Sequence, residues 1–257
     1  MISMPEIGFT GRERKFIEEM NEREVASPHG WLNQLELDEL AQNFDMEVVG
    51  RGAECVVLAP MEEQPKSPRV KAILTYEHFT PPLAKALFYS HRILSTLFPH
   101  NFPRFYAAFS GEEEKLSGSV RHRISSTPLT DHVGSGNASL KRLEWRTIGR
   151  LKSAALGKTI SRYPFSKALK DCKRLGIDIR YDNSAVNFIL GDDGGEYYVD
   201  SVINNITKLS QAHNLVDAKD NIIAYMQKYK FSEEEVHLVN TSLDRLSTTL
   251  TDSEEAS

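Results

Sequence analysis

The sequence contains few cysteines and lacks the signatures of several protein classes. Only Cys55 and Cys172 occur in 257 residues, and they form neither a CxxC pair nor a secretory framework. This usage fits a reducing compartment. The eight histidines include no HxH or HxxxH pair, which argues against a structural zinc site.

Long hydrophobic runs and a basic surplus are also absent. Residues 1–6 lack the basic-then-apolar pattern of a signal peptide, and no apolar run approaches the length that spans a membrane. The formal net charge of −5 argues against a nucleic-acid partner. We therefore expect a cytoplasmic protein with no membrane span, although delivery by a non-classical route would leave no mark in the sequence.

The hydrophobic content of 40% and the charged content of 26% are typical of a globular chain. Short β-branched runs dominate the first part and helical periodicity dominates the second, which favours an α+β fold with two lobes. Helices are expected at 12–24, 31–44, 83–97, 143–156, 164–175, 211–229 and 233–250. Strands are expected at 46–49, 54–58, 69–74, 105–109 and 118–124, the first three as an antiparallel meander.

The region from Asp182 to Asp200 carries the strongest functional pattern. Asn187 follows Asp182 by five residues and precedes an apolar strand, a Gly/Asp turn and a second apolar strand that ends at Asp200. The two strands should form a hairpin that places Asn187 and Asp200 at neighbouring strand ends. An amide oxygen and a carboxylate there could hold Mg²⁺ against nucleotide phosphates, with Asp182 beside an attacking hydroxyl.

Two weaker features lie upstream. Gly50 and Gly52 would let the backbone approach phosphate oxygens, and Val57 on the next strand would pack on a nucleobase, although a glycine at a hairpin turn is the commoner reading. Lys71, on the third strand, could pair with the phosphates or face solvent.

In this order, the motifs resemble those of the protein-kinase-like phosphotransferase superfamily over residues 46–205. Gly50, Gly52 and Val57 match its GxGxxGxV loop, with Cys55 at the position where the third glycine usually falls. The other matches are the strand lysine in 69–71, the catalytic loop in 180–190 and the metal-binding DFG, which reads DSV at 200–202.

The resemblance implies a two-lobed fold and an activity. It implies an N-terminal helical extension (1–45), an N-lobe of antiparallel sheet plus helix (46–125), a mainly helical C-lobe (126–250) and a disordered tail (251–257). The strand and hinge that meet adenine would be 120–129. ATP and Mg²⁺ would be the cofactors, and a hydroxyl of a small molecule or protein would be the acceptor. Asp182 would be catalytic, Asn187 and Asp200 would bind the metal, and Lys71 would steady the phosphates.

Departures from the family pattern leave alternatives open. No acidic residue lies between His78 and Gly111, so Ser90 or His91 falls where the helix glutamate that pairs with the strand lysine is expected. Glu77 or Glu54 are the other candidate partners. No APE-like segment follows residue 200, and few residues remain after it, which indicates a compact, atypical member.

The missing glutamate also favours a second hypothesis, in which the chain is a catalytically impaired pseudokinase that binds nucleotide or protein. A competing alignment of the catalytic loop exists as well. In it, Asp178 and Asn183 would take the places of Asp182 and Asn187, but the strand that follows is poorer and the spacing to residue 200 fits less well.

Overall fold

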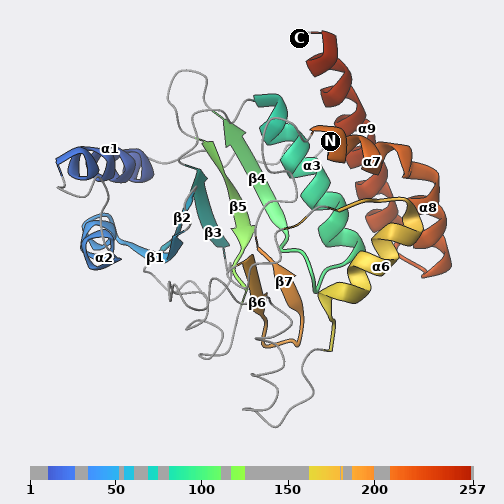
Figure 1. Cartoon of the computed structure of the whole chain (residues 1–257), viewed down its shortest axis with the longest axis horizontal. Coiled ribbons are helices and arrows are strands. Elements are labelled where there is room, and N and C mark those ends of the chain that lie inside the picture. The colour runs from blue at the N-terminus through green and yellow to red at the C-terminus, as the bar shows by residue number, and fades with distance from the viewer. Residues whose placement is uncertain are drawn as a thin grey trace.

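The computed structural model describes residues 11–26, 34–51, 55–60, 69–74, 81–110, 117–124, 162–179, 181, 187–199 and 209–255. Over these residues the chain is α+β, with one five-stranded antiparallel sheet, one two-stranded hairpin and several helices (Figure 1). The coarse fold class expected from the sequence is confirmed. The helix expected at 143–156 lies outside the described residues, as does the part of the expected hinge (120–129) that follows residue 124.

The five-stranded sheet has the order β1-β2-β3-β5-β4, and all its neighbours pair antiparallel. The first three strands form the expected meander. Helix α3 (Pro81–Leu97) connects β3 to β4 and packs along β4. The strands are β1 (Met46–Arg51), β2 (Cys55–Pro60), β3 (Arg69–Leu74), β4 (Phe105–Ser110) and β5 (Ser117–His122).

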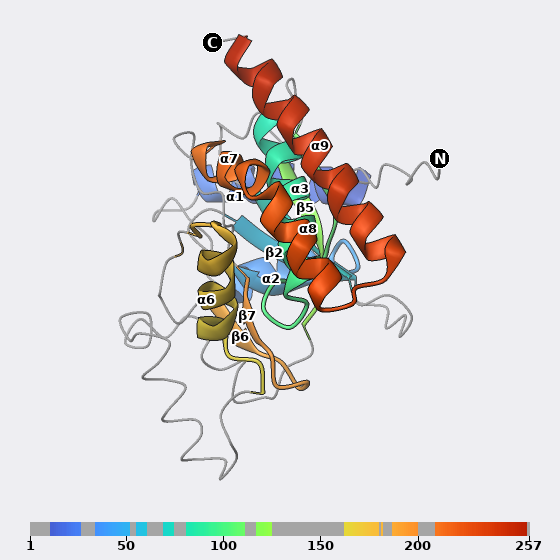
Figure 2. The same ribbon diagram turned by 90° about the vertical axis from the view of Figure 1, so that its right-hand side faces the viewer.

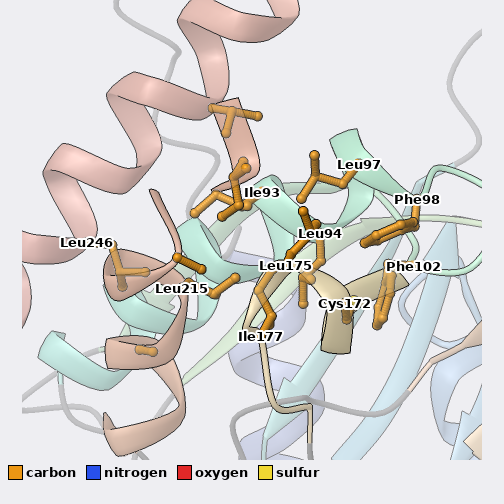
Figure 3. Close-up of a cluster of buried hydrophobic side chains, with 14 of the residues drawn as sticks. Ile93, Leu94, Leu97, Phe98, Phe102, Cys172, Leu175, Ile177, Leu215 and Leu246 are labelled. Carbon is orange, nitrogen blue, oxygen red and sulfur yellow. The ribbon is translucent and has the colours of Figure 1, made fainter. Parts of the chain in front are cut away.

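In the part of the chain that the structure describes, the larger of two hydrophobic clusters surrounds α3. Leucine, isoleucine and alanine recur on this helix at helical spacing and are buried on several sides. The cluster is completed by α6 (Phe165–Leu175), α7 (Leu209–Asp217), α8 (Lys219–Lys228) and α9 (Glu233–Glu255). In Figure 3, side chains from α3, α6, α7 and α9 meet in this cluster. Figure 2 shows α9 crossing α3, and the two helices are in extensive contact.

A smaller cluster joins the N-terminal helices to the edge of the sheet. Helices α1 (Gly11–Ala26) and α2 (Gln34–Gln42) lie beyond β1 and β2 in Figure 1. The Phe16 ring meets Phe44 edge-on, with centroids 6.2 Å apart. The buried members of this cluster are Phe16, Met20, Leu37, Leu40, Ala41, Met46, Val56 and Leu58.

The C-terminal helices differ from the expectation in two places. The single helix expected at 211–229 is divided at Ala218, where φ is −84° and ψ is 5°, and both halves pack against α9. Helix α9 continues to Glu255, so most of the tail expected to be disordered at 251–257 is helical. Leu250 is buried near this end, and Ser253 Oγ donates to the Leu250 carbonyl at 2.7 Å.

The start of α9 agrees with the sequence. Ser232 and Glu235 form a capping box before the helix expected at 233–250, with Glu235 N 3.2 Å from Ser232 Oγ and Ser232 N 2.8 Å from Glu235 Oε2. Among the helices in the described ranges, none has the length and apolar character needed to cross a bilayer.

Candidate functional site

The hairpin that carries Asn187 forms where the sequence predicts it. Strand β6 (Phe188–Leu190) pairs antiparallel with β7 (Glu196–Tyr198). The ladder continues by one bond, because Val199 N donates to the Asn187 carbonyl at 2.9 Å. Asn187 therefore lies beside the residue that precedes Asp200, as the expected metal site requires of the backbone.

The turn between these strands needs glycine. Gly194 has a φ of +82°, in the left-handed region that side chains disfavour, and a Cβ there would lie 3.0 Å from Arg162 Cβ. Gly191 N donates to Gly195 O at 2.9 Å and closes the turn. The Gly/Asp composition of this segment was thus a correct turn signal.

Two of the three side chains on which the predicted metal and catalytic site depends lie outside the described residues, namely Asp182 and Asp200. Asn187 is half-buried. Asp178, the acid of the competing alignment, is exposed, and its partner Asn183 lies outside the described residues. Within the described ranges, no three His, Cys, Asp or Glu side chains group closely enough to hold a metal ion.

The donor types that the sequence assigns to the metal fit Mg²⁺. Asn187 and Asp200 offer an amide oxygen and a carboxylate, which are the ligands that this ion prefers. The described part of this arrangement is the Asn187 backbone, which is paired with the strand end that leads to Asp200.

The sheet register separates the residues expected to bind nucleotide. Gly50 pairs with Val57, Val57 with Ala72, and Ala72 with Ser119, so these four positions form one row across four strands. Lys71 belongs to the neighbouring row, opposite Leu58 and Val120.

Successive residues of a strand lie on opposite faces of a sheet. The position of Lys71 is therefore on the opposite face from Gly50 and Val57. Leu58, its partner in the row, packs into the small cluster with α1 and α2. Gly52 lies outside the described residues.

Arg121 of β5 links the sheet to the hairpin. Its Nε donates to Ser119 Oγ at 2.8 Å, and one terminal nitrogen donates to the Val199 carbonyl at 2.5 Å. Its guanidinium carbon also lies 4.5 Å from the centre of the Phe105 ring, on β4. The peptide that leads into Asp200 is thus hydrogen-bonded to the sheet.

Helix α3 presents Ser90 and His91 where a glutamate was expected, and both are fully buried. The His91 ring stacks on Phe105 at 4.0 Å, with an interplanar angle of 11°. Burial, and then the positive charge of Arg121, lowers the pKa of His91 well below its usual value. Within the described residues, Ser90 Oγ has no hydrogen-bond partner. Glu54 and Glu77, the alternative partners for Lys71, lie outside those residues.

The loop after α3 also binds the hairpin. His100 Nδ1 lies 2.6 Å from Asp193 Oδ2, and Tyr197 Oη donates to the same oxygen at 2.8 Å. The buried Asn101 donates its amide hydrogens to the carbonyls of Tyr163 at 2.9 Å and Glu196 at 3.1 Å. These contacts join α3 to the hairpin through a second, mostly polar connection.

The pKa of Asp193 reflects this environment. Partial burial opposes ionisation, but hydrogen bonds from Gly195 N, His100 and Tyr197 together outweigh it and lower the pKa of the carboxyl. Burial first, and then Asp193, raises the pKa of the Tyr197 phenol.

Sequence reasoning missed Arg121, Asn101 and the His100–Asp193 pair. No local motif includes Arg121, and Asp193 belongs to a segment that the sequence identifies only as a Gly/Asp turn. Their partners are far away along the chain, 78 residues for Arg121 and 93 for His100. Local pattern reading has no access to contacts of that separation.

No family model matches this chain, and no curated protein matches its sequence.

Proposed function

We propose that this chain is an ATP- and Mg²⁺-dependent phosphotransferase with a two-lobed protein-kinase-like fold. It would transfer the γ-phosphoryl group to a hydroxyl of a small molecule or protein. The observation that carries the proposal is the junction at Val199, which pairs with Asn187 and accepts a hydrogen bond from Arg121. Through this junction, the segment with the expected metal ligands abuts the sheet with the expected nucleotide loop.

The element order gives further support. A lysine on the third strand, a helix between the third and fourth strands and an acid–Asn–acid segment after the sheet follow the sequence of parts in this superfamily. Helix α3 occupies the place of the helix that would supply the glutamate.

The residues would act as follows. Asp182 orients the acceptor hydroxyl and takes its proton. The backbone at Gly50 and Gly52 approaches the phosphates, and Val57 packs on the base. Asn187 and Asp200 hold Mg²⁺, which, when bound with ATP, offsets charge on the transferred group.

A second function is favoured by α3 itself. This helix contains no acidic residue, and its centre buries Ser90 and His91 instead. A chain without the usual lysine–glutamate pair could act as a pseudokinase, binding nucleotide or a protein without transferring phosphate.

The two functions differ in how they use the metal. The test measures thermal unfolding with ATP, with and without Mg²⁺, together with transfer of labelled γ-phosphate to protein and to a panel of small hydroxyl compounds. The enzyme should show metal-dependent stabilisation and label transfer. Stabilisation that ignores Mg²⁺, without transfer, would identify the pseudokinase. No stabilisation by ATP under either condition would reject both.

Two single variants test which aspartate acts as the general base. Asp182→Asn should reduce label transfer by about 100-fold or more, because the general base is lost. Asp178→Asn is the matched control, since Asp178 is exposed and lies nearby in the chain. The reverse outcome, with Asp178→Asn inactive and Asp182→Asn active, would instead support the competing alignment.

A further inference from the structure

The strand register determines which basic side chain lies on the sheet face that carries Gly50 and Val57, where the nucleotide is expected. Gly50 and Val57 share their row with Ser119, and the Lys71 position lies on the other face. Arg121 is two residues after Ser119 on β5 and therefore shares its face. Its Nε donates a hydrogen bond to Ser119 Oγ. Arg121, unlike Lys71, is thus on the face where the nucleotide is expected.

Arg121 also connects the sheet to two other parts of the expected site, the β6–β7 hairpin and helix α3. Toward the hairpin, it donates to the Val199 carbonyl, one residue before Asp200. Toward α3, its guanidinium lies over the Phe105 ring. The buried His91 ring of α3 stacks on the same phenylalanine. Helix α3 is therefore connected to Arg121 through the stacked rings of His91 and Phe105. In the family pattern, a glutamate on this helix pairs with the strand lysine instead.

We infer that Arg121 is a positioning residue of the phosphotransferase site, holding the strand end with Asp200 against the Gly50–Val57 face. In this chain it replaces the lysine–glutamate pair as the link between α3, the sheet and the metal ligand. The planar guanidinium suits this role, because it donates in two directions while stacking on an aromatic ring. The inference rests on the proposed function.

The test compares Arg121 with Lys71. Arg121→Lys keeps the positive charge but loses the planar guanidinium with its several donors. Arg121→Gln keeps some hydrogen bonding but loses the charge. Lys71→Gln tests the cation that the family pattern assigns to the phosphates. Arg123→Gln is the matched control, at an exposed arginine that pairs with Glu47. The measurements are kcat and KM for ATP in the label-transfer assay, the Mg²⁺ concentration for half-maximal rate, and circular dichroism melting of each variant.

Both Arg121 variants should lower kcat/KM by about 10- to 100-fold, the range expected when hydrogen bonds to a charged group are lost. They should also raise the Mg²⁺ requirement, because the strand end with Asp200 is no longer held. Arg123→Gln should change either quantity by less than about threefold, because its ion pair with Glu47 is exposed. Lys71→Gln should lower kcat/KM by a smaller factor than either Arg121 variant. A shift in the Mg²⁺ requirement separates positioning of the metal ligand from a general loss of folded protein.

Ser119→Ala provides a milder variant if the Arg121 variants fold poorly. It removes only the acceptor of Arg121 Nε and should raise the Mg²⁺ requirement in the same direction by a smaller factor. Full loss of activity in Lys71→Gln, with Arg121→Lys and Ser119→Ala like the wild type, would overturn the inference and leave the proposed function standing. A wild-type chain that neither binds ATP nor transfers label would instead remove the proposed function.

Discussion

The two hydrophobic clusters hold their parts of the molecule in different ways. The larger cluster joins α3 to the C-terminal helices and the hairpin, and polar contacts through Asn101, His100 and Arg121 reinforce it. The smaller cluster joins α1 and α2 to β1 and β2 through apolar side chains. Each fully buried large apolar side chain contributes about 1.5 to 3 kcal/mol, so the larger cluster should dominate global stability.

This difference bears on the candidate site. The hairpin with Asn187 is anchored at its turn and at its open end, on the side of the larger cluster. The strands next to the expected glycine loop are anchored by the smaller cluster. We therefore expect the metal-binding side of the site to be the more rigid and the glycine-loop side to open more readily.

The largest effect should come from Phe102→Ala. Phe102 is fully buried in the larger cluster, 5.5 Å from Phe165 between ring centroids. Its loss should reduce the free energy of unfolding by about 3 to 5 kcal/mol, as measured by urea denaturation. Tyr229→Ala, at an exposed ring, is the control and should change it little. A loss below about 1 kcal/mol for Phe102→Ala would contradict the dominance of this cluster.

A smaller effect is expected from Asn101→Asp. The buried amide donates to two carbonyls, and a carboxylate can donate to neither. Unfolding free energy should fall by about 2 to 3 kcal/mol. Asn221→Asp is the matched control, because Asn221 is exposed and donates to one carbonyl, that of Leu175. Equal losses in both variants would mean that the polar connection adds nothing to the larger cluster.

Phe16→Ala should act locally. Phe16 is as fully buried as Phe102, but it belongs to the smaller cluster. We expect hydrogen exchange to accelerate in α1 and α2 while α3 and α9 keep their protection, with a loss of global stability below about 1.5 kcal/mol. Faster exchange in α3 would show that the two clusters unfold together.

The smallest effect concerns pH. The lowered pKa of Asp193 means that its ionised form stabilises the folded chain above the unfolded value of about 3.9, and that this stabilisation is lost as pH falls through the folded-state pKa. Asp193→Asn should therefore be less stable than wild type at neutral pH, and the difference should shrink in acid. Because Asp193 is largely exposed, we expect less than about 1 kcal/mol. A difference that stays constant with pH would exclude the ionised carboxyl as its source.

Local signals in the sequence were sufficient for most elements. Short runs rich in β-branched residues predicted the strands of the meander, and helical spacing predicted α3, α6 and the start of α9. The turn glycines and flanking apolar runs gave the β6–β7 hairpin. The division at Ala218 was missed, because its residues are compatible with a continuous helix and only packing on α9 distinguishes the two halves.

The order of secondary structure and the pairing of Asn187 with the strand before Asp200 were determined by sequence, because propensity, turn chemistry and hydrophobic period act over a few residues. The tertiary structure alone decided that Arg121 and not the Lys71 position shares a face with Val57. A shift of one residue in strand register exchanges the two faces of a sheet, and register depends on contacts between segments distant in the chain. A bulge between Val48 and Gly50 adds one such shift that no local pattern announces.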